Sequence, residues 1–169
     1  MKQIIKNIFI ETYKFNSSRE ASTFLSNQVA EKILSLNDSY GDYYYCIVGY
    51  HSLTLEKKFV LLFSSDEKED NLNFMFWDNS LVLDTGRNIY LIDENLDIKV
   101  ILEVFTPFRG LYLINNEKLL VLEDIYLTII NYDGDVIMQE SFDFIENLSI
   151  QDNVLSIQTS EGNKVFQLA

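Results

Sequence analysis

From Leu72 onward, the hydrophobic residues of the chain occur in short runs that polar segments separate. Runs such as 80–83 (SLVL) and 89–92 (IYLI) are bounded by turn-forming residues, a pattern typical of β-strands. The Asp133-Gly134 dipeptide between two such runs is a strong hairpin signal. The pattern predicts strands near 72–77, 80–84, 88–93, 98–104, 110–114, 118–123, 126–131, 136–141, 145–150, 154–159 and 164–168.

The same arrangement of strands occurs almost three times along the chain. Its first copy has apolar runs at 80–83, 89–92 and 98–101. Adding 38 to each number gives the matching runs 118–121, 127–130 and 136–139, and a shortened third copy follows at 154–157 and 164–166. A unit of this kind cannot bury its own apolar faces, so we expect the copies to stack on one another.

The strands of the repeats are apolar on both faces. In 119–122 and 127–130 both alternating sets of side chains are mainly apolar, whereas a half-solvated sheet would be polar on one face. We therefore expect meander sheets covered on both faces, like the blades of a β-propeller. Closed propellers usually have at least about four blades. Two copies and a partial third therefore predict an open stack or sandwich.

The N-terminal residues follow different patterns. Residues 4–13 are rich in β-branched and aromatic side chains and predict one strand. Ser17 and Glu20 have the spacing of a capping box, which marks a helix start. Behind them apolar residues recur at every fourth position, namely Ala21, Leu25, Val29 and Ile33. This stripe predicts an amphipathic helix over 18–36.

The predicted fold class is α+β and predominantly antiparallel β, in a single domain of residues 1–169. An α/β module at 1–63, with further strands at 43–50 and 58–63, would cap the stack and complete its short last sheet. The β-meander repeats would occupy 72–169, in copies at about 72–105, 109–141 and 145–169.

The composition suits a folded protein of a reducing compartment. Hydrophobic residues make up 47% of the chain and aromatic residues 14%, which is unlike a disordered sequence. Cys46 is the single cysteine, so no internal disulfide can form and a cytoplasmic location is expected. The first residues lack the pattern of a secretory signal. No apolar run approaches the about 18 residues that suggest a membrane span.

Negative charge is concentrated in the β-rich part. The chain has a net charge of −13. Residues 1–41 contain five Lys/Arg and four Asp/Glu, which gives +1, whereas residues 42–169 contain eight and twenty-two, which gives −14. Such a surface repels the phosphates of nucleic acids and anionic membranes. We therefore expect neither nucleic acid nor a membrane as a partner.

The sequence contains no recognisable catalytic motif. His51 is the only histidine and lies in a predicted turn, without a serine or cysteine motif beside it. One His and one Cys do not make a zinc site, and no glycine pattern resembles a phosphate-binding loop. Asp133-Gly134-Asp135 lacks the spacing of a calcium loop. We therefore predict no catalytic residue, no metal and no cofactor.

The meander topology orders the acidic turns. In an up-and-down meander, the first and third turns emerge at one edge of the sheet. That edge would collect the carboxylates of Asp78, Asp93, Glu94, Asp97, Glu117, Asp133, Asp135 and Asp152. Trp77 and Tyr132 border it, and exposed aromatic residues there could anchor a partner. The simpler interpretation is that acidic turns only keep the protein soluble and prevent strand-to-strand aggregation.

Three functions compete on these grounds. The leading hypothesis is a non-catalytic protein whose acidic edge docks a basic protein; its size and charge resemble those of small acidic immunity or inhibitor proteins, which neutralise basic toxins. The alternative is an intracellular scaffold or small-ligand-binding module, with a pocket formed by Tyr43, Tyr44, Tyr45 and Tyr50. The third, a carboxylate-based hydrolase, would require two acids in one cleft with a raised pKa.

Overall fold

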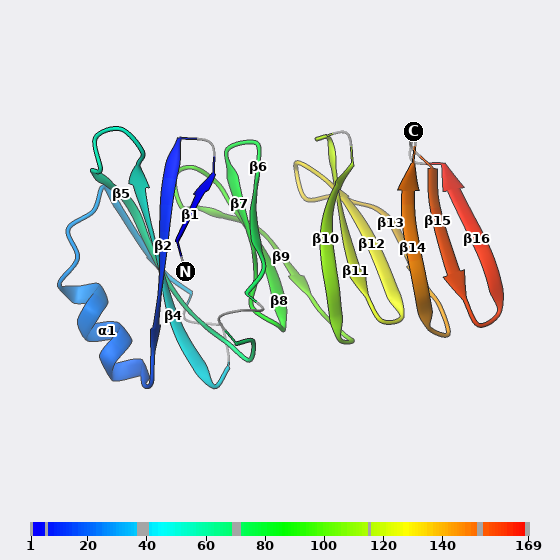
Figure 1. The fold of residues 1–169 in the computed structure, drawn as a ribbon, viewed down its shortest axis with the longest axis horizontal. Helices are drawn as coiled ribbons and strands as arrows, with labels where there is room; N and C mark the ends of the chain where they lie inside the picture. Colours follow the sequence, from blue (N-terminus) through cyan, green and yellow to red (C-terminus); the bar gives the residue numbers. More distant parts are fainter. Residues whose placement is uncertain are drawn as a thin grey trace. The chain divides into compact units, whose positions relative to one another are not determined.

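The computed structural model describes residues 2–5, 7–36, 41–68, 72–114, 116–151 and 154–167, and side chains from residue 7 onward. The chain divides into two compact units, Met1–Glu103 and Val104–Ala169, here called the N-terminal and C-terminal units. The N-terminal unit joins the α/β segment to the first meander, and the C-terminal unit contains the other two meanders (Figure 1). Mostly antiparallel β-structure in several sheets, as predicted, is confirmed.

A five-stranded sheet begins the N-terminal unit. Its strands are β1 (Lys2–Ile5), β2 (Ile8–Phe15), β3 (Lys32–Ser35), β4 (Tyr43–His51) and β5 (Lys57–Ser65). Their order is β1-β2-β4-β5-β3, and β3 runs parallel to β5 while the other pairs are antiparallel. We call it the N-terminal sheet. Long apolar runs in β4 and β5 bury both faces of its centre.

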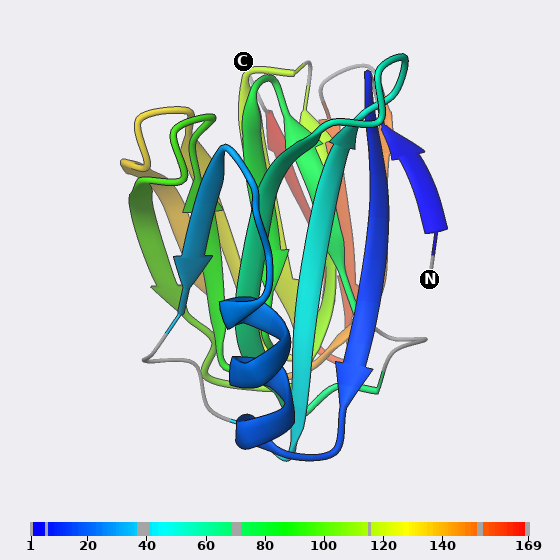
Figure 2. The same cartoon turned by 90° about the vertical axis from the view of Figure 1, so that its left-hand side faces the viewer.

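The predicted capping signal starts the single helix among the described residues, α1 (Ser18–Ser26). The Ser17 hydroxyl accepts the backbone N–H of Glu20 at 3.2 Å, and the Glu20 carboxylate accepts the N–H of Asn16 at 3.1 Å. Phe24 and Leu25 pack on the face of the N-terminal sheet that carries Cys46, Val48 and Val60. Figure 2 shows the helix lying across this sheet.

Two N-terminal predictions are wrong. The helix ends at the Asn27 cap instead of continuing to residue 36, and Val29 is 87% exposed. Residues 32–35 form β3, because the free edge of β5 offers backbone hydrogen-bond partners. The β-branched Ile33 also has a slightly lower helix propensity. The predicted strand at 4–13 is a hairpin of β1 and β2, with Ile5 opposite Ile8. Asn7 lies at the reversal between the two strands.

The first meander covers the other face of the N-terminal sheet. It consists of β6 (Phe74–Trp77), β7 (Ser80–Asp84), β8 (Asn88–Ile92) and β9 (Ile98–Glu103), in chain order. The shared core contains Tyr45, Ile47, Leu61 and Phe63 from the sheet and Leu81, Leu83, Tyr90 and Ile92 from the meander. The N-terminal unit is thus built of three layers: helix, sheet and sheet.

The C-terminal unit contains the second and third meanders. The second consists of β10 (Phe108–Ile114), β11 (Lys118–Glu123), β12 (Tyr126–Asn131) and β13 (Val136–Ser141); the third of β14 (Ile145–Gln151), β15 (Val154–Thr159) and β16 (Gly162–Gln167). Their facing sides share a core that includes Leu120, Leu127, Ile129, Leu155 and Ile157. The third meander has three strands. The prediction that N-terminal residues complete it is wrong, because they pair within their own sheet.

The repeat extends to the backbone conformation. Asp78 and Asn116, 38 residues apart, both have a positive φ, at 51° and 59°. Leu96 and Gly134, also 38 apart, have φ of 61° and 89°. Equivalent turns therefore use the left-handed region at equivalent positions, even where the residue is not glycine.

Candidate functional site

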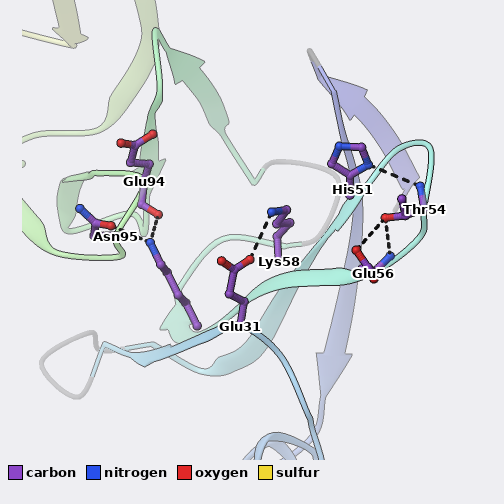
Figure 3. A network of polar contacts seen from close by, with 8 residues as sticks. Glu31, His51, Thr54, Glu56, Lys58, Glu94 and Asn95 are labelled. Atoms are coloured by element: carbon purple, nitrogen blue, oxygen red, sulfur yellow. Dashed lines mark hydrogen bonds and ion pairs between the residues drawn. The ribbon is translucent and has the colours of Figure 1, made fainter.

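A cleft of about 420 Å³ opens at one end of the N-terminal unit. Its floor is apolar and belongs to the shared core or packs against it, with Ile8, Phe59, Phe76, Leu81 and Leu96. Polar groups surround this floor on two sides. The N-terminal sheet contributes one wall and the turns of the first meander the other (Figure 3).

Lys32 joins the two walls. Its ammonium donates to the backbone oxygen of Glu94 and to Oδ1 of Asn95, both at 2.7 Å. Both acceptors are neutral, so the positive charge of Lys32 has no carboxylate partner among the described residues. Figure 3 shows that the backbone oxygen of Glu94 accepts this bond, while the Glu94 carboxylate points away from the ammonium.

Lys58 supplies a second ammonium on the same wall. Its Nζ lies 3.2 Å from Oε2 of Glu31, and the two side chains are 44% and 59% exposed. An ion pair this exposed to water contributes little to stability, and either side chain can turn to another partner. The basic wall, as we call Lys32 and Lys58 together, therefore combines one anchored and one adjustable ammonium.

His51 lies at the rim of the cleft as part of a turn. Its Nδ1 accepts the backbone N–H groups of Leu53 and Thr54 at 3.4 Å each. Within the described residues no carboxylate or nucleophile contacts the ring. Long, local hydrogen bonds of this kind fit a turn histidine and give no sign of acid–base catalysis.

The predicted acidic residues of the first meander lie at this same end. Asp78, Glu94 and Asp97 are exposed, and Asp93 is half-buried. Oδ1 of Asp93 accepts the N–H groups of Asn95 and Asp97 at 2.8 and 3.0 Å. Its carboxylate therefore holds the β8–β9 turn in shape. We call Asp93 and Glu94 the acidic wall of the cleft.

The remaining predicted carboxylates belong to the C-terminal unit. Glu117, Asp133 and Asp135 are exposed at the turns of the second meander, and these turns share one edge because the sheet order follows the chain. Oδ2 of Asp135 accepts a hydrogen bond from the Asn131 amide at 3.1 Å. Tyr132 is half-buried beside them. Asp152 lies outside the described residues.

The expectation of an exposed Trp77 is wrong. Its side chain is 0% exposed. Trp77 ends β6 opposite the equally buried Ser80 in a tight hairpin, and a large indole gains most by leaving water. A partner could not use it as an anchor on this surface.

The tyrosine cluster of the alternative hypothesis does not line this cleft, and Tyr44 borders a smaller pocket of about 200 Å³. Tyr45 is fully buried, stacks on Phe63 with ring centroids 5.6 Å apart, and donates its hydroxyl to the backbone oxygen of Glu67 at 2.8 Å. None of the four tyrosines lines the cleft. Their bulk packs the N-terminal sheet instead.

The basic wall is the part of the site that the sequence did not reveal. Lys32 was placed on a helix, and its contact with Asn95 joins residues 63 positions apart. The available signal was the short apolar pair Ile33-Leu34 between polar residues, which fits an edge strand as well as a helix.

Two buried groups have shifted pKa values. Burial raises the pKa of the Cys46 thiol to about 12, so this cysteine is unreactive at neutral pH. Burial also raises the pKa of Asp84 to about 6, opposed by the Gly86 N–H and Asn73 amide. Oδ2 of Asp84 has no hydrogen-bond partner among the residues that the structure describes. Asp84 ends β7 at the opposite edge of the meander from the cleft.

Two further properties concern the described part of the chain. No three His, Cys, Asp or Glu side chains there are grouped to hold a metal ion. The one helix found there is far too short to cross a lipid bilayer.

Comparisons with known proteins give a fold and no family. No family model and no curated protein matches the chain. Among solved structures it is similar to BamB from Moraxella catarrhalis (19% identity, 76% of this chain and 41% of that one, TM-score 0.47) and to Kluyveromyces lactis Hsv2p (10% identity, 73% and 40%, TM-score 0.50). The chain thus spans about two fifths of their length. The likeness to Hsv2p supports propeller-like meander sheets, and at this identity it shows the fold alone.

Proposed function

We propose that this protein is a non-catalytic binding protein that docks a basic protein partner on the acidic turns of its meanders. The observation that carries the proposal is the exposure of carboxylates at the same kind of turn in both units: Asp78, Glu94, Asp97, Glu117, Asp133 and Asp135. Like charges gathered at a sheet edge attract a cationic surface and can accelerate association about 10–10³-fold.

The charge balance of the C-terminal unit supports the proposal. Residues 104–169 contain three Lys/Arg and ten Asp/Glu, and 3 − 10 gives −7. Arg109 donates to Asp124 at 2.5 Å and to the backbone oxygen of Ile145. Lys164 lies 4.7 Å from the ring centroid of Phe142. Arg109 and Lys164 are thus engaged within the unit, and the exposed turns remain strongly anionic.

An inhibitor-like role fits this profile. A small acidic protein can neutralise a basic enzyme or toxin by covering its cationic active site, and it needs no catalytic group of its own. The partner proposed here is therefore a protein with a concentrated positive surface.

The test uses the full chain as bait in its native host at low and at high salt. A rim variant, Asp97→Asn/Glu117→Gln/Asp133→Asn, removes three exposed charges from the turns. Wild type should recover a basic protein at low salt and release it at high salt, because screening weakens exposed charge pairs. The rim variant should recover at most about one tenth as much, given the range expected for electrostatic steering.

A matched control removes the same number of charges from the other edge. Glu103, Glu146 and Glu161 are exposed and lie at strand ends away from the acidic turns. Their combined change to Gln should leave recovery of the basic protein near the wild-type level. Equal losses in both triple variants would show that only net charge matters. Equal recovery by wild type and rim variant would overturn the proposal.

A further inference from the structure

The cleft of the N-terminal unit has the form of a small-molecule site. Its volume, about 420 Å³, falls within the range of ligand pockets, which are commonly about 300–1,000 Å³ with an apolar lining and a few polar groups. Phe59, Phe76 and Leu81 give it a rigid apolar floor, because they belong to or pack against the shared core. An apolar group of a ligand would be taken out of water there.

The basic wall can receive a carboxylate. An ammonium has three N–H donors, and Lys32 uses two of them, on the backbone oxygen of Glu94 and on Asn95. These two bonds hold Nζ in place and leave one donor. Lys58 forms an exposed ion pair with Glu31, which also lines the cleft, and its remaining N–H groups can supply a second donor.

The acidic wall can receive an ammonium group. Oδ1 of Asp93 is occupied by the N–H groups of Asn95 and Asp97, which fixes the orientation of the carboxylate. Oδ2 accepts no bond from the described residues and is available. Because Lys32 of β3 bonds to the two residues that follow Asp93, its ammonium lies against the same turn that carries the Asp93 carboxylate.

We propose that this cleft binds a small zwitterionic ligand with an apolar side chain, of which an apolar α-amino acid is the simplest. The ligand carboxylate bonds to Lys32, its ammonium to Asp93, and its side chain covers the apolar floor. An α-amino acid carries its carboxylate and its ammonium on one carbon atom, which suits a site where Lys32 and Asp93 meet at one turn. This site shares the β8–β9 turn with the proposed docking surface, but its two polar contacts are made by Lys32 and Asp93, which the rim variant leaves in place.

The experiment titrates the full chain with L-phenylalanine and L-leucine and follows backbone amide shifts by NMR. 3-Phenylpropionate lacks the ammonium and 2-phenylethylamine lacks the carboxylate, so they separate the two walls. Both amino acids should shift the amides around Lys32 and Asn95. Phenylalanine should bind roughly fivefold or more tightly than either truncated analogue, since each loses one partly exposed ion pair.

Two variants assign the contacts. Lys32→Met keeps the apolar stem and should weaken phenylalanine and 3-phenylpropionate roughly fivefold, with no effect on 2-phenylethylamine. Asp93→Asn should weaken phenylalanine and 2-phenylethylamine to the same extent and spare 3-phenylpropionate. Asp93→Asn is expected to fold, because Asn131 at the equivalent position makes the same turn bond, to the N–H of Asp135 at 2.8 Å.

Asp97→Asn is the matched control, because it removes an exposed carboxylate of the same turn that does not line the cleft. It should bind phenylalanine within about twofold of wild type. The rim variant used for protein docking should also bind normally, so that failure of either proposal is visible separately. Absence of shifts in the cleft with both amino acids, or equal effects of Lys32→Met and Asp93→Asn on all ligands, would overturn the inference.

Discussion

The β8–β9 turn of the N-terminal unit and the β12–β13 turn of the C-terminal unit are equivalent in the repeat and differ in their surroundings. Asp93 and Asn131 accept the N–H of Asp97 and Asp135, respectively, at 3.0 and 2.8 Å. Beside the first turn Lys32 closes a cleft, whereas Val136 and Ile137 beside the second are about half exposed. The repeat therefore determines the conformation of both turns. The first turn also lines the cleft, because the N-terminal sheet lies beside it.

The ends of β7 and β11, the second strands of the first and second meanders, also differ although they are equivalent in the repeat. Asp84, a buried acid, stands where the second meander has the buried Leu122, 38 residues on. Thr85 correspondingly stands where the second meander has Glu123. Glu123 is 3% exposed, and its Oε2 accepts the N–H groups of Phe105 and Thr106 at 2.8 and 2.6 Å. Among the described residues, each unit thus has one buried carboxylate, and the two make different contacts.

The largest expected effect comes from removing the Glu123 carboxylate. Glu123→Ala leaves two backbone N–H groups without their acceptor and should lower the free energy of unfolding by about 3 kcal/mol. Thr85→Ala, at the equivalent position, loses the hydroxyl bond to the Asn88 oxygen at 3.0 Å and should cost about 1 kcal/mol. Urea denaturation measures both. A smaller loss for Glu123→Ala than for Thr85→Ala would contradict this role.

Asp84 should make stability depend on pH. Its pKa is raised from 3.8 to about 6 in the folded protein, so its contribution is fully present below pH 3.8 and is lost as pH rises through about 6. Asp84→Asn keeps an acceptor for the Gly86 N–H and should be more stable than wild type at pH 7.5, by up to about 3 kcal/mol.

Near pH 4 the same two proteins should unfold almost together, because Asp84 is then mostly protonated. Denaturant titrations at both pH values test this. Leu122→Asn, at the equivalent position, should destabilise the protein at either pH because it buries a polar amide. A pH-independent difference between wild type and Asp84→Asn would rule out the raised pKa as the cause.

A smaller effect is expected where the two turns differ in residue type. Gly134 has φ of 89°, so Gly134→Ala places a Cβ in the left-handed region and should cost about 1 kcal/mol. The exposed neighbour gives the control, since Asp133→Ala should change stability by less than about 0.5 kcal/mol. Thermal unfolding of both variants makes the comparison, and equal midpoints would argue against backbone strain at Gly134.

The smallest effect should follow from making the two turns alike. Asp93→Asn provides the acceptor that Asn131 already provides, so stability should change by less than about 0.5 kcal/mol. Asp93→Ala removes the acceptor of two N–H groups and should cost about 1 kcal/mol. Urea denaturation of the pair tests whether the oxygen or the charge holds the turn.

The repeats were predictable because their information is local. Runs such as 118–123 and 126–131 combine strand-forming side chains with short polar turns, and each pairs with its neighbour in the chain. The segment 27–36 was not predictable in this way. Val29 and Ile33 have helical spacing, but β3 is determined by pairing with β5, which is distant in sequence.

The candidate site was likewise predictable only where its residues are placed by local structure. The positions of Asp78, Asp93 and Glu94 at one edge of the first meander follow from meander topology. The opposing Lys32 does not follow, because it reaches Asn95 across 63 positions of the chain. The burial of Trp77 depends on packing at the end of a hairpin, and strand patterns carry no information about that.

Lys32 begins a strand of only four residues, β3, at the outer margin of the N-terminal sheet. Short strands at the edge of a sheet are among the first elements to unfold locally. A molecule held by Lys32 on one side and by Asp93 on the other would fasten this strand to the meander beneath it. Binding in the cleft would then slow amide hydrogen exchange along β3, while the global free energy of unfolding would change little.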